Sequence, residues 1–521
     1  MKALATQGLV GLSFELPAAR SVVRNPAQEE MRSWVLEYMP RVQETEFGNL
    51  NYTARVTARL APSTFFVSDT ESFKPAISTT EAAEWATRQD AYIRDHDMLL
   101  IEGYIGPSSE VRAGAQLYIE KTQANIPAMQ QQLFFPPDAA WTPKFTTIYT
   151  PGLPAPGKPN DCLIMVDLQA GVTRVLGSDY FGESKMGGLR MWNHHVFEQG
   201  GLACHAGLKV FPGHQTPSGE EEAALIIGLS GTGKTTTTFR QQLGSMPVQD
   251  DFVALMPGGR VFSPENGCFA KTFGLDPNDE PTIYYGTTHP SGWLENVSVD
   301  SEGRVDFFDT THTANGRSTF PLANIPHRDP AGLPQARYLL ILNRNDNVVP
   351  AVARLTRDQI ATYFMLGETR GTSAGGAAEQ GKNLRVPGTN PFFFTNDALQ
   401  GNRLLELLQT MPDLQAFLLN TGRVGGGEEG DGSKNVSISH SAAAVAGIVG
   451  GTIEWVLDPD FGYEVAAAVP GIDDLDLLHP VRLYEAQDRL EEYKTLVERF
   501  QEERSAYLAR FPGLAPSIAR L

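Results

Sequence analysis

The chain contains 521 residues, of which 41% are hydrophobic and 20% are charged. This composition is typical of a globular protein with a full core, and the length favours two to four domains or two large lobes. The formal net charge of −19 argues against nucleic acid or an anionic membrane as the main partner, because both bind basic surfaces. Three cysteines are too few for a disulfide framework, and no secretory or membrane-spanning pattern is evident, so we expect a cytoplasmic protein.

The first two hundred or so residues mix helical with strand-like patterns. The helical patterns cover residues 28–39 and 80–94, and the strand-like runs cover residues 65–67, 98–102, 162–167 and 173–176. A proline-rich passage between residues 135 and 159 is interpreted as a crossing between lobes.

A strand-like run at residues 224–227 leads into the most informative segment of the chain. This segment consists of Gly228, Leu229, Ser230, Gly231, Thr232, Gly233, Lys234, Thr235 and Thr236. It fits the P-loop pattern, in which glycines let backbone N–H groups surround phosphate oxygens, Lys234 reaches the β- and γ-phosphates, and Thr235 binds a divalent cation. The alternative is a glycine-rich turn that fits by accident, and the preceding strand argues against it. The sequence therefore predicts binding of a nucleoside triphosphate.

Beyond the P-loop, residues 248–255 and 337–342 are again strand-like, and the glycine-rich stretches 371–388 and 422–432 are interpreted as mobile loops. Residues 482–511 predict one long helix with an apolar stripe at three- and four-residue spacing. Such a stripe usually packs on its own domain, and a dimeric coiled coil is the alternative.

Two adjacent aspartates, Asp250 and Asp251, end the first strand after the P-loop. A P-loop Mg²⁺ normally has a carboxylate partner at the end of a neighbouring strand, so these residues are candidates for cation binding. A surface acidic pair would be the preferred interpretation without the P-loop. His205 taken alone is more often a structural histidine than a ligand.

Several motifs occur in an order that is specific to one family. They are Tyr180-Phe-Gly-Glu183, His205, the P-loop, Asp250-Asp251, the run at residues 265–272, the run at residues 294–297 and Arg317 within residues 315–321. In this order they resemble ATP-dependent phosphoenolpyruvate carboxykinase, most clearly over residues 180–356. The resemblance implies a two-lobed, P-loop-containing α/β fold with mixed sheets and an active-site cleft between the lobes. We expect a substrate-side lobe at residues 1–210 and a nucleotide-binding lobe at residues 211–521.

The family converts oxaloacetate and ATP to phosphoenolpyruvate, CO₂ and ADP in gluconeogenesis, with Mg²⁺ on the nucleotide and Mn²⁺ as a second cation. The resemblance implies roles at matching positions. The nucleotide is bound by Gly228 to Thr236 together with Glu280 and Ser441. Mg²⁺ is bound by Thr235, and Mn²⁺ by His205 and Asp251. The substrate is bound by Arg59, Tyr180 and Arg317, and the catalytic residues are Lys185, Ser230, Lys271 and Arg317. A neutral imidazole with a carboxylate suits Mn²⁺. We expect a monomer that binds only these small molecules.

Four departures from the family pattern bear on this interpretation. The run at residues 57–61 keeps Arg59 but has Ala58 where the family has glycine, and Asn435 replaces an arginine near the adenine. The loop at residues 372–378 differs from the family motif. An ungapped comparison also places Met186 where the family has a metal-binding lysine, and a thioether is a poor ligand for Mn²⁺. Either Lys185 takes this role, or the metal site is weakened.

Two other functions remain open at this point. The first is a P-loop kinase or phosphorylase of the same fold that phosphorylates another acceptor, which the altered lysine and loops favour. The second is a nucleotide-binding sensor with little turnover, whose glycine-rich loops and terminal helix serve partners. Retention of Arg59, His205 and Arg317 together favours the carboxykinase.

Overall fold

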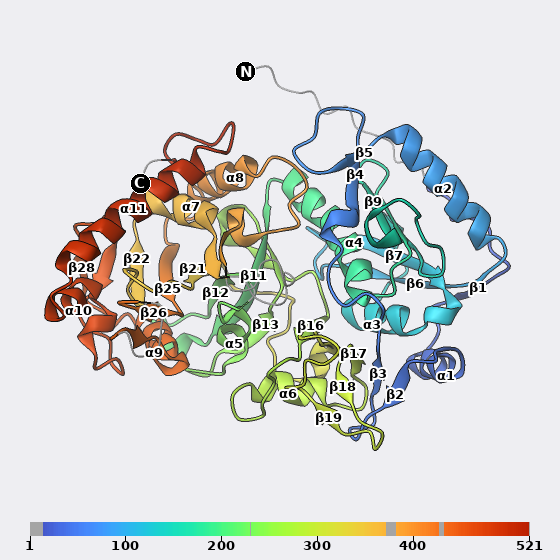
Figure 1. Ribbon diagram of the computed structural model, residues 1–521, viewed down its shortest axis with the longest axis horizontal. Coiled ribbons are helices and arrows are strands. Elements are labelled where there is room, and N and C mark those ends of the chain that lie inside the picture. The colour runs from blue at the N-terminus through green and yellow to red at the C-terminus, as the bar shows by residue number, and fades with distance from the viewer. Residues whose placement is uncertain (1–13, 230, 371–381, 427–431, 520–521) are drawn as a thin grey trace.

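The computed structural model describes residues 14–229, 231–370, 382–426 and 432–519, and its fold is mixed α/β, as predicted. Three large sheets organise these residues, with the eight-stranded sheet on the right of Figure 1 and the ten-stranded sheet on the left. Ser230, the loop at residues 372–378 and residues 427–431 of the second glycine-rich stretch lie outside the described residues. Within the described ranges, no helix combines the length and the apolar character needed to cross a membrane.

An eight-stranded sheet forms the N-terminal side, in the order β1-β6-β7-β8-β10-β9-β4-β5. Its strands are β1 Ser21–Arg24, β4 Thr64–Val67, β5 Ala76–Ile77, β6 Asp97–Ile105, β7 Ala113–Glu120, β8 Phe145–Thr150, β9 Leu163–Asp167 and β10 Val172–Leu176. The helices of this part are α1 Gln28–Tyr38, α2 Thr79–Ile93, α3 Asn125–Leu133 and α4 Phe181–Glu198.

The proline-rich passage does not cross between lobes, so that interpretation is wrong. Its central residues form β8, which pairs in parallel with β7 and β10 inside the eight-stranded sheet. The six residues of β8 contain no proline and three threonines, so they supply every ladder donor and suit a pleated sheet. The prolines lie on either side of this strand.

A ten-stranded sheet forms the C-terminal side, in the order β15-β14-β11-β12-β21-β25-β22-β29-β28 with β13 also paired to β11. Its strands are β11 Leu202–Phe211, β12 Glu222–Ile227, β13 Met246–Gln249, β14 Phe252–Leu255, β15 Val261–Phe262, β21 Ala336–Asn343, β22 Val352–Leu355, β25 Gln415–Asn420, β28 Trp455–Leu457 and β29 Glu464–Ala466. The helices here are α5 Lys234–Phe239, α7 Arg357–Leu366, α8 Ala398–Leu408 and α9 Ile438–Val449. The expected lobe boundary after residue 210 lies inside β11, and the division itself stays a prediction.

A five-stranded sheet lies below the other two in Figure 1, in the order β16-β20-β17-β3-β2. Its strands are β2 Val42–Glu44, β3 Leu50–Tyr52, β16 Gly267–Lys271, β17 Trp293–Glu295 and β20 Arg317–Pro321, with α6 Pro281–Thr287 beside them. Three small ribbons complete the strands: β18 Ser298–Val299 with β19 Val305–Asp306, β23 Glu368–Arg370 with β24 Asn383–Arg385, and β26 Arg423–Val424 with β27 Lys434–Asn435. Parallel pairing of β3 with β17 joins an N-terminal segment to the middle of the chain.

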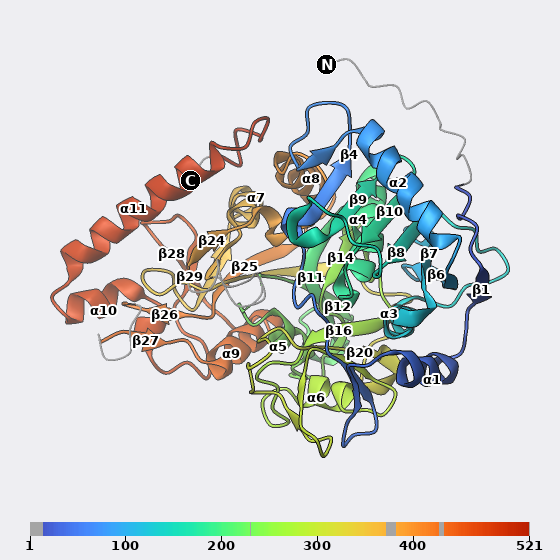
Figure 2. The ribbon, with the colours of Figure 1, turned by 45° about the vertical axis from the view of Figure 1, so that its right-hand side comes forward.

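The predicted long C-terminal helix is wrong, because two helices replace it: α10 Pro480–Ala486 and α11 Leu490–Leu508 (Figure 2). Asp488 between them has φ of 56°, a left-handed conformation that a continuous helix does not contain. Tyr493, Val497 and Phe500 of α11 pack with Tyr484 of α10. The apolar stripe therefore packs within the chain, as the first interpretation predicted.

Candidate active site

The P-loop lies between the end of β12 and the start of α5, as the sequence predicts. Gly231 and Gly233 have φ of 84° and 85°, which favours glycine. A Cβ at Gly228 would lie 2.4 Å from Oγ1 of Thr232, whose hydroxyl donates to the Leu229 carbonyl at 2.7 Å. The described part of the loop is therefore tightly curled, and the Thr232 amide also donates to the Leu229 carbonyl, at 3.2 Å.

The two threonines after the P-loop lysine each contact a carboxylate. The Thr235 hydroxyl donates to Oδ2 of Asp250 at 3.3 Å, and the Thr236 hydroxyl donates to Oε1 of Glu280 at 2.6 Å. Oδ1 of Asp250 is buried and accepts no hydrogen bond from any described residue. Burial, followed by the charge of Asp251, raises the pKa of Asp250 to about 6. A hydroxyl beside an unsatisfied carboxylate oxygen is a donor set that fits Mg²⁺.

Asp251 is the centre of the site, because three basic side chains from different elements surround it. Lys185 Nζ lies 2.6 Å from Oδ2, His205 Nε2 lies 3.0 Å from Oδ1, and Lys234 Nζ lies 3.8 Å from Oδ1. The predicted strand at residues 248–255 is divided here, because β13 ends and β14 begins on either side of the aspartate pair. These lysines hold the pKa of Asp251 well below its usual range despite its burial.

His205 is arranged as a neutral ligand. Its Nδ1 lies 2.8 Å from the Thr389 carbonyl, which can only accept, so Nδ1 carries the proton. Burial and the charge of Lys234 lower the pKa of His205, so the ring is neutral near pH 7 and its Nε2 lone pair faces Asp251. Two acceptors 3.0 Å apart are unfavourable unless a cation lies beside them, so this pair fits Mn²⁺. Among the described residues, no cluster brings together three His, Cys, Asp or Glu side chains as metal ligands.

Lys185, rather than Met186, lies at this centre. Its side chain is 2% exposed, and Nζ is also 2.8 Å from Oε2 of Glu265. Successive helical residues point about 100° apart, so Met186 on α4 faces elsewhere. Burial lowers the pKa of Lys185, but Asp251 and Glu265 outweigh it, and the pKa is raised overall. The depressed pKa predicted for a metal-bound amine is therefore absent from this arrangement.

Lys271 and Arg317 lie side by side at the end of the five-stranded sheet, where they are register partners on β16 and β20. Burial, followed by the charge of Arg317, lowers the pKa of Lys271 to about 8. The Arg317 guanidinium lies 5.2 Å from the Phe269 ring centroid and donates to Oδ1 of Asn315 at 2.8 Å. Tyr180 is buried nearby, and burial raises its pKa although Arg317 opposes the shift. These groups form the cationic side of the site.

Arg59 reaches the same centre through an aromatic ring. Its guanidinium lies 5.3 Å from the Phe392 ring centroid, and the His205 ring lies 6.1 Å from that ring. The buried Arg190 guanidinium is 5.9 Å from it, and it pairs with Glu183 at 3.4 Å. Phe392 therefore lies between Arg59 and His205, and the substrate-binding role of Arg59 stays a prediction. Neither Arg190 nor Phe392 was predicted; the only local signal was the run of three phenylalanines at residues 392–394.

The expected adenine side of the site is less closely joined to the P-loop. The Ser441 hydroxyl donates to the Ser437 carbonyl within the first turn of α9, at 3.4 Å. Asn435 is exposed on β27, where its register partner is Arg423. Sequence reasoning missed two contacts that hold the loop: Arg344 donates to the Gly231 carbonyl at 3.1 Å, and Thr421 donates to the Thr232 carbonyl at 2.9 Å.

A family model described as phosphoenolpyruvate carboxykinase matches residues 20–475. The chain belongs to this family. It is 29% identical to the ATP-dependent phosphoenolpyruvate carboxykinase of Aeropyrum pernix over 81% of this chain and 83% of that protein. It is 30% identical to that of Bradyrhizobium diazoefficiens over 70% and 68%, and 28% identical to that of Geobacillus thermodenitrificans over 94% of each.

Two departures of this carboxykinase from its family pattern have a structural explanation. Ala58 is not among the described residues with positive φ, so the loss of glycine before Arg59 imposes no backbone strain. Glu183 fixes this loop, because its Oε1 accepts from the Leu60 amide at 2.7 Å. Lys185 occupies the place beside Asp251 that Met186 leaves. Nothing in the structure explains Asn435.

Proposed function

We propose that this carboxykinase converts oxaloacetate and ATP to phosphoenolpyruvate, CO₂ and ADP, a reaction of gluconeogenesis. The observation that carries the proposal is the arrangement around Asp251, where Lys185, His205 and Lys234 converge on one carboxylate. This carboxylate joins the P-loop to the lysine of α4, so phosphate and enolate chemistry share one centre. The relatives named above bear the name of this enzyme.

In the first half-reaction, Arg59 and Tyr180 bind oxaloacetate by its carboxylate. The carbon–carbon bond to the departing carboxylate breaks, CO₂ leaves, and the electron pair moves to the neighbouring carbonyl oxygen as an enolate. Lys185 and Arg317 supply positive charge where the negative charge develops. Burial strengthens this effect, because Lys185 is almost inaccessible to water.

In the second half-reaction, the enolate oxygen attacks the γ-phosphorus of ATP, and the bond from that phosphorus to the ADP oxygen breaks. The P-loop amides and Lys234 hold the phosphates, while Lys271 and Arg317 face the transferred group. Because the pKa of Lys271 is lowered only to about 8, its amine is still mostly protonated at pH 7. No water is required, so exclusion of water protects both ATP and the enolate.

Two cations fit the described donors. Thr235 and Asp250 would hold Mg²⁺ with the nucleotide, and His205 and Asp251 would hold Mn²⁺ with Lys185 beside them. Bound there, the cations supply charge that stabilises the enolate and the transferred phosphoryl group. A monomeric state and a cytoplasmic location stay predictions.

The direct test incubates the purified chain with oxaloacetate, ATP, Mg²⁺ and Mn²⁺, and measures phosphoenolpyruvate, ADP and CO₂. We expect equal amounts of the three products, and none from Lys234→Ala. ADP formed at the same rate without oxaloacetate would overturn the proposal, because the phosphoryl group would then pass to water or to a protein hydroxyl. Tight ATP binding without any turnover would overturn it in favour of a nucleotide-binding sensor.

A further inference from the structure

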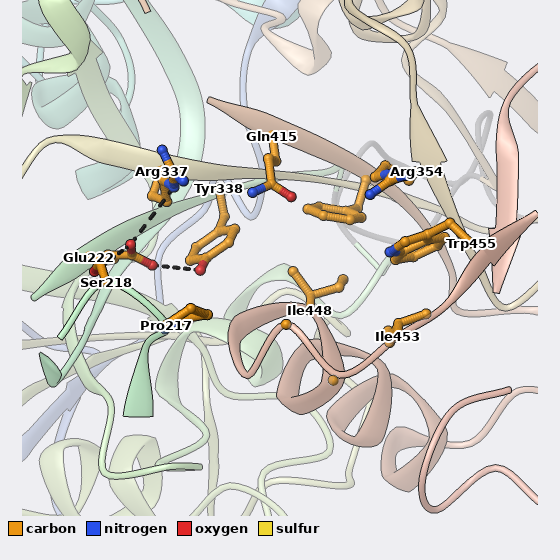
Figure 3. A pocket seen from close by; sticks show the side chains of 13 residues that line it. Pro217, Ser218, Glu222, Arg337, Tyr338, Arg354, Gln415, Ile448, Ile453 and Trp455 are labelled. Carbon is orange, nitrogen blue, oxygen red and sulfur yellow. Dashed lines mark hydrogen bonds and ion pairs between the residues drawn. The ribbon is translucent and has the colours of Figure 1, made fainter. Parts of the chain in front are cut away.

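A cavity of about 200 Å³ lies at the start of strands β12, β21 and β25, where helix α9 ends (Figure 3). The P-loop follows the opposite end of β12, and a strand of six residues spans about 17 Å. The three strands are parallel, so the cavity lies at their N-terminal ends and the phosphate site lies at their C-terminal ends. The cavity is therefore separate from the proposed active site.

A cation with unused donors lies at one side of this cavity. The Arg337 guanidinium is 3.7 Å from Oε1 of Glu222 and 3.6 Å from Oδ1 of Asp413. Neither distance is a hydrogen bond, and Arg337 makes no side-chain hydrogen bond to any described residue. The side chain is 33% exposed and forms part of the cavity wall. A carboxylate arriving there would meet a planar, bidentate partner.

An anionic group with spare acceptor capacity lies next to this arginine. Glu222 is 9% exposed, its Oε2 accepts from the Tyr338 hydroxyl at 2.5 Å, and its Oε1 accepts from the Ser218 hydroxyl at 2.9 Å. A carboxylate has about four acceptor positions, so Glu222 can take a further donor. Glu222 also opposes a simple anion in the cavity. The pair Arg337 and Glu222 therefore favours a ligand that carries both charges.

Apolar side chains form the rest of the wall. Figure 3 shows Ile448 and Ile453 on one side, Trp455 at the far end and Gln415 opposite Ile448. The Phe417 and Trp455 rings lie 5.5 Å apart at 39°, which makes an angled aromatic surface. A branched hydrocarbon fits such a surface, while the amide of Gln415 adds a polar group to the wall.

We propose that this cavity binds a free α-amino acid with a branched apolar side chain. Its carboxylate would bind Arg337 and Gln415, its ammonium group would bind Glu222, and its side chain would lie against Ile448 and Trp455. The volume is equivalent to about six or seven liquid waters, and covalently joined atoms pack more closely than water, so an amino acid of the size of leucine fits.

The test is isothermal titration calorimetry of the full chain with three probes of the same hydrocarbon shape. L-leucine carries both charges, 4-methylpentanoate lacks the ammonium group, and 3-methylbutylamine lacks the carboxylate. We expect L-leucine to bind with a dissociation constant of about 1 mM or lower. The other two should bind at least about tenfold more weakly, because each leaves one charged partner unpaired. Equal binding of L-leucine and 4-methylpentanoate, or no binding of L-leucine, would overturn the proposal.

Variants locate the binding event. Arg337→Gln should weaken L-leucine binding at least about tenfold while phosphoenolpyruvate formation stays within twofold. The matched control is Arg304→Gln, because Arg304 is an exposed arginine in two surface ion pairs, and this variant should bind as the parent does. Arg337→Lys keeps the charge and should retain intermediate affinity, so it serves if Arg337→Gln does not fold. Unchanged binding in both Arg337 variants would place the leucine elsewhere and refute the inference.

Discussion

Replacing Lys185 by methionine removes the ammonium group that lies between the half-buried carboxylate of Asp251 and the buried carboxylate of Glu265. Lys185→Met keeps the hydrocarbon stem but leaves Asp251 and Glu265 without the amine that lies 2.6 and 2.8 Å from them. Removing one partner of a buried ion pair typically costs about 3–5 kcal/mol. Part of this cost is avoidable here, because burial already raises the pKa of Glu265 to about 7, although Lys185 opposes the shift. Near pH 7, protonation of Glu265 therefore relieves the repulsion at little cost.

This relief makes the effect depend on pH in a defined direction. The pKa of Glu265 is raised on folding, so its stabilising contribution is complete below about 4.5 and is lost as pH rises through the folded value of about 7. Without Lys185 the folded value rises further, so the loss continues above pH 7. Between pH 7 and 8.5, the destabilisation of Lys185→Met should therefore grow by about 2 kcal/mol, at about 1.4 kcal/mol per pH unit.

Urea denaturation at pH 6, 7 and 8.5 measures this effect, and steady-state kinetics measures the chemistry. Mn²⁺-dependent turnover should fall by about 10²–10³-fold, with ATP affinity changed only a few-fold. The matched control is Met186→Leu, a volume-conserving change that should cost less than about 1.5 kcal/mol. Met186→Lys should not tighten Mn²⁺ binding, because residue 186 points about 100° around α4 from Lys185, which already contacts Asp251. A harmless Lys185→Met together with tighter Mn²⁺ binding in Met186→Lys would refute the arrangement.

Three further changes test other parts of the structure. Lys234→Ala should lower turnover by several powers of ten with an unchanged circular dichroism spectrum, and residual activity near the parent level would move the nucleotide site elsewhere. Glu368→Gln leaves Arg504, which is 1% exposed, without its carboxylate and should cost about 3–5 kcal/mol in urea denaturation. Arg504 outweighs burial and lowers the pKa of Glu368 to about 2. The stability difference between the parent and Glu368→Gln should therefore shrink as pH falls from about 4.5 toward 2. A difference that stays constant over this range would contradict the role of Glu368. Burial and Arg240 lower the pKa of Lys209 to about 7, so its stabilising contribution is lost as pH falls from about 10.5 through 7. Lys209→Met should therefore remove the rise of the free energy of unfolding with pH in this range. An unchanged rise would exclude Lys209 as its source.

The sequence was sufficient where the chemistry depends on a short segment. The P-loop could be predicted because its glycines, lysine and threonine must follow one another directly after a strand. The aspartate pair could be predicted for the same reason, since it ends a strand close to that loop. Arg59, His205 and Arg317 could not be brought together by local pattern, and only the family resemblance indicated their common site.

Tertiary structure decided the features that sequence reasoning missed. Phe392 lies between Arg59 and His205 because a segment from residues 387–394 crosses β11, where Asn390 donates to the Ala203 carbonyl at 3.2 Å. No hydrophobic period or turn residue encodes such a contact. The break between α10 and α11 was missed because the apolar spacing continues across it, whereas Gln487, Asp488 and Arg489 all leave the helical conformation.

Anionic substrates need a locally basic site. In this acidic protein, that site is assembled around Asp251 from elements of three sheets. Helix α4, which carries Lys185, contacts β8 and β10 of the eight-stranded sheet and β11 of the ten-stranded sheet. Lys271 and Arg317 come from the five-stranded sheet, so the cations that anionic substrates require arrive from separate parts of the chain. Held together without counterions, these cations would repel one another at low dielectric. Asp251 and Glu265 offset that repulsion, and the phosphates and carboxylates of the substrates then bind to cations that are already in place.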